Sequence, residues 1–171
     1  MKLFKSGMQS RGLTPVYNAG DGNCVFISLA QIVFGDPTKF AFMRYMIIHR
    51  LKSFPKKYHK FPNYYNSMAI NNRPASELEL QVIADICHSV VECYSTNDYL
   101  KPTNTIRPLR FCESTSYIRL WIKDDHCVAL VDHQCPPLIG LLRKKLIGSL
   151  RKNLIESLRK KFWLEISIIK S

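Results

Sequence analysis

The chain has 171 residues, 46% of them hydrophobic, and a formal net charge of +12. It is long enough for one domain with a sizeable core and too short for two full domains. Residues 136–171 carry nine Lys/Arg against two Asp/Glu, which leaves sixteen against eleven in residues 1–135. We therefore predict a domain over residues 1–135 and a basic tail over residues 136–171, with no nucleic acid required by the domain.

Apolar residues at helical spacing run from Val25 to Leu51, on both sides of Gly35-Asp36-Pro37. Because Gly and Pro interrupt helices, this pattern predicts two helices that meet at the tripeptide. Residues 52–74 indicate an irregular or weakly helical connection. A further helix is expected to begin at Ser76, which can cap it, with Glu79 completing a capping box.

Strand patterns follow that helix. Residues 90–94, 117–122 and 126–131 are predicted strands, residues 95–108 a loop, and residues 123–125 a short turn. His126 would then begin the last strand beside a turn, facing solvent and within reach of a neighbour. The pattern as a whole is typical of an α/β (α+β) domain with a small twisted sheet between helices.

The tail is a near repeat with a period of eight residues, starting at Leu138, Leu146 and Leu154. An apolar residue at every fourth position drifts around a helix, so the predicted basic helical tail is a poor straight amphipathic helix. Two interpretations stay open. The tail is either a loosely attached duplicated helix, or a segment that docks on an anionic membrane or an acidic partner.

Six cysteines stand at positions 24, 87, 93, 112, 127 and 135, and no two have Cys-x-x-Cys spacing. The spacing gives no indication of zinc. Residues 1–5 do not begin the apolar core of a signal peptide, so we expect a reducing, intracellular (cytoplasmic) location. A run of about 18 apolar residues, as a membrane span needs, is absent from the sequence.

The turn Asp21-Gly22-Asn23 leads directly into Cys24 and an apolar helix. Amides at a helix start are unpaired and carry partial positive charge, so they favour a thiolate and can hold an oxyanion. We expect the turn to leave Cys24 accessible. His126 alone among five histidines combines a turn–strand junction with nearby acids, which makes Cys24 and His126 a candidate nucleophile and general base. The alternatives are a buried core cysteine and a histidine satisfied within its strand.

These residues resemble the ovarian tumour (OTU) domain cysteine proteases, most of whose characterised members are deubiquitinases. The resemblance spans roughly residues 14–133. It rests on four segments: Asp21–Cys24 with Phe26 and Ser28, Arg44, Ser76–Gln81, and His126–Val131. It implies a papain-like fold in which Cys24 is the nucleophile, His126 the general base and residues 21–23 the loop that shapes the oxyanion hole, without metal or cofactor.

The resemblance also implies the reaction and the partner. Thiolate attack on the isopeptide carbonyl at the C-terminus of ubiquitin or a ubiquitin-like modifier would give an acyl-enzyme that water hydrolyses. The small size hints at a viral or intracellular-bacterial protein that acts in a host cell.

The third catalytic residue departs from the family pattern. Many members carry Asp or Asn two positions after the histidine, where this chain has Val128. Some members supply this residue from before the cysteine, which makes Asn18 and Asp21 the candidates; Asp124, Asp125 and Asp132 also lie near His126 in sequence. A ubiquitin-binding module with impaired catalysis, or a nucleic-acid-binding or membrane-binding protein acting through its tail, are the alternative functions.

Overall fold

The structure is a computed structural model that describes residues 2–58, 62–96, 98, 100–109, 116–132, 134 and 137–140. The chain divides into units 1–138 and 139–171. Leu138 still packs on the first unit, because its side chain is buried and its amide donates to the Ile32 carbonyl at 3.4 Å. The predicted boundary after residue 135 stays a prediction, and the repeats from residue 141 onward lie outside the described residues. No helix in the described ranges has the length and apolar character needed to cross a bilayer.

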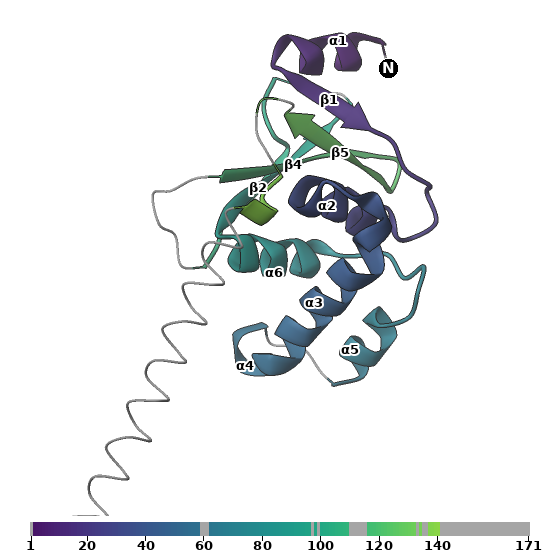
Figure 1. Cartoon of the computed structure of the whole chain (residues 1–171), viewed down its shortest axis with the longest axis vertical. Helices are drawn as coiled ribbons and strands as arrows, with labels where there is room; N and C mark the ends of the chain where they lie inside the picture. Colours follow the sequence, from purple (N-terminus) through teal and green to yellow (C-terminus); the bar gives the residue numbers. More distant parts are fainter. Residues whose placement is uncertain are drawn as a thin grey trace, which may run out of the picture. The chain divides into compact units, whose positions relative to one another are not determined.

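A five-stranded sheet forms the centre of the first unit, with strand order β1-β5-β4-β2-β3 (Figure 1). The strands are β1 (Leu13–Val16), β2 (Ser89–Ser95), β3 (Asn104–Ile106), β4 (Ser116–Lys123) and β5 (His126–Asp132). The pair β2 and β4 is parallel, and the other neighbours are antiparallel. The predicted strands 90–94, 117–122 and 126–131 are therefore confirmed.

The described residues form six α-helices: α1 (Lys2–Ser10), α2 (Cys24–Phe34), α3 (Phe40–Ser53), α4 (Pro55–Tyr58), α5 (Pro62–Met68) and α6 (Glu77–Cys87). The predicted break between the first two apolar helices is confirmed, because Gly35 ends α2 with a φ of 70° and a 3-10 turn, η1 (Pro37–Lys39), precedes α3. The capping box of α6 is also present. Ser76 accepts from the Leu78 amide at 3.3 Å, and Glu79 accepts from the Ser76 amide at 2.7 Å.

The helices cover both faces of the sheet, with α1 on one side and α2 and α6 on the other (Figure 1). Beneath α1 lies a buried cluster of Phe4, Met8, Leu13, Tyr94, Trp121, Val128 and Leu130. Phe4 stacks on Trp121 with ring centroids 4.3 Å apart. Val128 therefore serves the packing of α1 against the sheet, and an apolar side chain is the right one for that site.

Four elements were not predicted from the sequence: α1, β1, β3 and the short 3-10 turn η1. The predicted loop over residues 95–108 is wrong for residues 104–106, which pair with residues 91–93 of β2. A three-residue strand is too short to show alternation, and only its partner strand fixes it. In α1, Phe4 and Met8 share one helix face and are buried against the sheet. Tertiary packing therefore stabilises this helix, which the local sequence pattern does not predict.

We expect Phe4→Ala to lower the free energy of unfolding by about 3 to 5 kcal/mol, because it removes a fully buried ring stacked on Trp121. Urea denaturation measures the loss. Leu100→Ala is the control, because that side chain is 77% exposed and its removal should change stability by less than about 0.5 kcal/mol. Equal losses in the two variants would show that α1 is not packed as described.

Candidate active site

Cys24 is the first residue of α2, and the residue before it leaves the helix start uncapped. Asn23 occupies the N-cap position but makes no side-chain hydrogen bond to the helix. The first intrahelical bond runs from the Ile27 amide to the Asn23 carbonyl at 2.9 Å. The amides of residues 24–26 therefore have no acceptor within the helix, and their partial positive charge gathers around Cys24.

The β4–β5 hairpin reaches over this helix start. Lys123 pairs with His126 across a two-residue turn, in which Asp124 and Asp125 both have positive φ, 47° and 62°. This is the turn geometry that suits a tight hairpin. It brings the Asp125 carbonyl to the Cys24 thiol, which donates to it at 4.0 Å. The structure thus brings Cys24 to the residue directly before His126.

The expectation that Cys24 is accessible is wrong, because its exposed fraction is only 5%. The hairpin above it, rather than the turn before it, decides the exposure. His126 is half-buried instead of facing solvent, and its Nδ1 is buried without a hydrogen-bond partner. Gly20 lies against this nitrogen so closely that a Cβ there would stand 3.3 Å from it.

Asn18 joins α2 to the start of β5. Its side-chain amide nitrogen donates to Ser28 Oγ at 2.9 Å, to the Cys127 carbonyl at 3.1 Å and to the Cys24 carbonyl at 3.4 Å. Carbonyl oxygens only accept, so these contacts fix which end of the Asn18 amide is nitrogen. The other end, Oδ1, is buried and has no hydrogen-bond partner.

Asp21 is occupied within its own turn. One carboxylate oxygen accepts from the Asn23 amide at 3.1 Å and the other from the Asn23 side chain at 3.3 Å. Asp21 therefore shapes the turn before Cys24. The Asn23 amide is also engaged by this contact, so the amides from Cys24 onward are the ones left to hold an oxyanion.

Arg44 anchors the turn from below. This buried side chain of α3 donates to Asn23 Oδ1 at 2.7 Å, and also to the carbonyls of Arg73 at 2.8 Å and Met68 at 2.9 Å. Its guanidinium lies 3.8 Å from the centroid of the Phe26 ring. Burial lowers the pKa of Arg44, and the charges of Glu79 and Asp21 act in the opposite direction.

Asn72 completes the support. Its amide donates to Asn23 Oδ1 at 3.2 Å, and its Oδ1 accepts from Asn23 Nδ2. Asn72 has a positive φ of 64°, which Asn tolerates better than most residues. Asn72, Ser28 and Gly20 were not identified from the sequence as parts of the site. The sequence Asn-Asn-Arg-Pro at residues 71–74 is typical of a turn, but it does not indicate that this turn contacts Asn23.

Two other thiols are buried in the sheet, that of Cys127 in β5 and that of Cys93 in β2. Burial raises the pKa of Cys127 and, to about 11, that of Cys93, so both remain thiols at neutral pH. Within the described ranges, no three His, Cys, Asp or Glu side chains converge as a metal site.

No protein-family model and no curated protein matches the chain. Solved structures do match. The OTU domain of OTUD1 aligns with a TM-score of 0.65 at 17% identity, over 75% of this chain and 91% of that one. An ovarian tumour domain in complex with ubiquitin gives 0.57 at 15% identity, over 77% and 81% of the two chains.

Viral structures match as well. The OTU domain protease of Taggert virus gives a TM-score of 0.58 at 17% identity, over 74% of this chain and 83% of that one. The Hazara virus OTU bound to ubiquitin gives 0.54 at 15% identity, over 70% and 80%. The resemblance found in the sequence is thereby confirmed at the level of the fold: this chain has the OTU fold.

The turn before Cys24 can be tested with two glycines of similar backbone. Gly22 and Gly12 have positive φ of 78° and 74°, so Ala should cost each about 1 to 2 kcal/mol. A Cβ on Gly22 would also collide with the Asn72 carbonyl, whereas one on Gly12 meets nothing within 4 Å. We expect Gly22→Ala to unfold at a clearly lower temperature than Gly12→Ala. If the two variants melt together, residue 72 does not lie against the turn.

Proposed function

We propose that this chain is a cysteine protease that hydrolyses the bond at the C-terminus of ubiquitin or a ubiquitin-like modifier. The observation that carries the proposal is the position of Cys24, at an uncapped helix start and in contact with the hairpin that begins β5 with His126. The ubiquitin complexes among the structural neighbours support the choice of substrate. The buried thiols of Cys93 and Cys127, which form no disulfide, fit a reducing compartment, and we extend the proposal to the cytoplasm.

The reaction follows from these groups. His126 takes the thiol proton of Cys24, and the thiolate attacks the carbonyl carbon of the substrate's C-terminal glycine bond. The oxyanion that forms is held by the free amides at the start of α2. His126 then gives its proton to the leaving amine, and water, deprotonated by the same imidazole, releases the acyl group and restores Cys24.

We assign Asn18 as the residue that orients His126. Its Oδ1 is a buried acceptor without a partner, and the same side chain is fixed on the backbone of Cys127, the residue after His126. An imidazole N–H is the donor that such an acceptor needs. Asp21 is not assigned this orienting role, because both of its carboxylate oxygens accept hydrogen bonds from Asn23. Its role is to hold the turn before Cys24.

One observation favours the alternative of a ubiquitin-binding module with impaired catalysis. His126 Nδ1 has no hydrogen-bond partner, and Val128, two residues later, is part of the core. If no residue orients the imidazole, the domain would bind a modifier and turn it over slowly.

A ubiquitin derivative with an electrophile at its C-terminus tests the proposed function. The wild type should form a covalent adduct, visible by denaturing electrophoresis, and Cys24→Ala should form none. Cys87→Ala removes another buried thiol and should label as the wild type does. Absence of an adduct with the wild type would sink the ubiquitin protease proposal, whereas an adduct with Cys24→Ala would assign the nucleophile elsewhere.

Asn18→Ala should lower kcat/KM for diubiquitin cleavage by about a hundredfold and alter the pH–rate profile, because the imidazole loses its orienting acceptor. Ser28→Ala is the matched control, since it removes one partner of Asn18 Nδ2 and leaves Oδ1 in place. That variant should keep the wild-type pH–rate profile. If Asn18→Ala also keeps it, Asn18 only clamps the two backbone segments.

A further inference from the structure

The net positive charge of the domain comes from one segment. Residues 37–76 contain eight Lys/Arg and no Asp/Glu, which leaves eight Lys/Arg against eleven Asp/Glu in the rest of residues 1–135. The segment includes α3, α4 and α5. An even spread of charge would not indicate the charge of a partner. A segment rich in Lys and Arg and without Asp or Glu favours a partner of negative charge.

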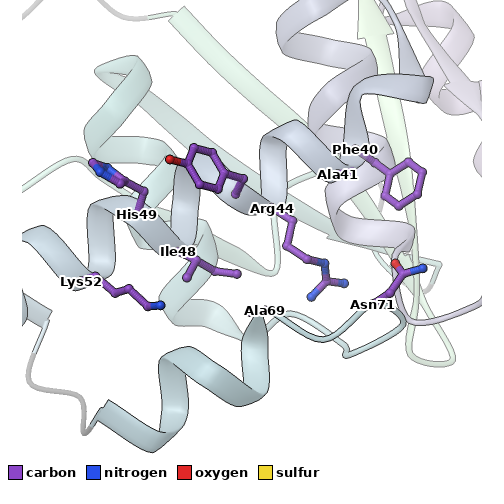
Figure 2. Close-up of a pocket in the computed structure, with 9 residues that line it drawn as sticks. Phe40, Ala41, Arg44, Ile48, His49, Lys52, Ala69 and Asn71 are labelled. Atoms are coloured by element: carbon purple, nitrogen blue, oxygen red, sulfur yellow. The ribbon is translucent and has the colours of Figure 1, made fainter.

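A cavity of about 430 Å³ opens within this segment, between α3 and the chain that follows α5 (Figure 2). Its wall is mostly carbon: Phe40, Ala41, Tyr45 and Ile48 come from α3, and Ala69 follows α5. The volume lies within the range of about 300 to 1,000 Å³ that is usual for binding pockets. Tyr45 is 62% exposed although its ring borders the cavity, as expected of a surface that is completed by a partner.

The polar groups of the cavity are cationic or neutral. His49 and Lys52 are exposed on α3 and three residues apart, which puts them on the same side of the helix. Arg44 forms another part of the wall, and its bonds go to carbonyl and amide oxygens instead of a carboxylate. Among the residues that the structure describes, no Asp or Glu lines the cavity. In the described part of the chain, Lys52 has no ion pair, in contrast to Lys57, which pairs with Asp85 at 2.9 Å.

We propose that this cavity is a docking site for an acidic segment of a partner protein. An apolar side chain of the segment enters the carbon-lined cavity, and a neighbouring carboxylate meets Lys52 and His49 at its edge. A concave apolar wall suits an apolar side chain of a protein partner. Nucleic acid binds mainly through its phosphates, which need cations and make no use of an apolar cavity. The cavity shares Arg44 with the turn before Cys24, but this docking proposal does not rest on the proposed function.

A short fluorescein-labelled peptide with a Leu-Phe pair flanked by glutamates is the probe, and fluorescence anisotropy gives its Kd. All measurements use the full-length chain with Cys24→Ala, so that a failed cleavage assay and a failed binding assay remain distinguishable. Lys52→Glu should weaken binding at least about tenfold by placing like charges together. Ala69→Trp should do the same by filling the cavity, at an exposed position where the larger side chain leaves the fold intact.

Lys56→Glu is the matched control, because Lys56 is exposed on α4, carries the same charge and does not line the cavity. We expect it to change Kd by no more than about twofold. The proposal is overturned if the peptide does not bind, if replacing Leu-Phe by Gly-Gly leaves Kd unchanged, or if Lys56→Glu weakens binding as much as Lys52→Glu. A fluorescein-labelled single-stranded oligonucleotide that binds more tightly than the peptide would also overturn it, in favour of nucleic acid.

Discussion

The contact between the Arg44 guanidinium and the Asn23 side chain is the interaction on which the geometry around Cys24 depends. Because Asn23 Oδ1 is committed to Arg44 and to the Asn72 amide, it cannot cap α2. The helix therefore begins without a side-chain cap, and its first amides stay available beside the thiol. Asn at this position usually caps the helix, but Asn23 instead stabilises the turn that precedes α2. Buried Arg44 supports this turn, because its guanidinium also donates to the backbone carbonyls of Met68, Gly22 and Arg73.

The other half of the site is organised by Asn18, whose single amide nitrogen joins the start of α2 to the start of β5. This clamp and the β4–β5 hairpin bury Cys24 almost completely. The buried Oδ1 of Asn18 and the buried Nδ1 of His126 are both left without partners. A buried polar atom without a partner costs free energy, so both atoms lower the stability of this region. Val128, in contrast, is an apolar side chain that packs in the buried cluster beneath α1.

Arg44 also connects the site with the cationic helices. The same side chain that holds Asn23 forms part of the wall of the cavity on α3. The turn before Cys24 and the cavity therefore share one side chain. Cys24 differs from Cys93 and Cys127 in its position at the start of α2, whereas burial raises the pKa of the other two thiols.

The sequence by itself determined the elements with strong local signals: the break at Gly35, the capping box at Ser76, the three longer strands, and the pairing of Cys24 with His126 as candidates. These signals are local, since periodicity, turn residues and caps act over a few positions. Tertiary structure alone decided α1, β1 and β3, the burial of Cys24, and the contacts of Asn18, Asn23, Arg44 and Asn72. The partners in those contacts lie up to 109 residues apart, as for Asn18 and Cys127. Only the folded chain brings such residues together, because hydrogen bonds and packing depend on distance in space and leave no periodic trace in the sequence.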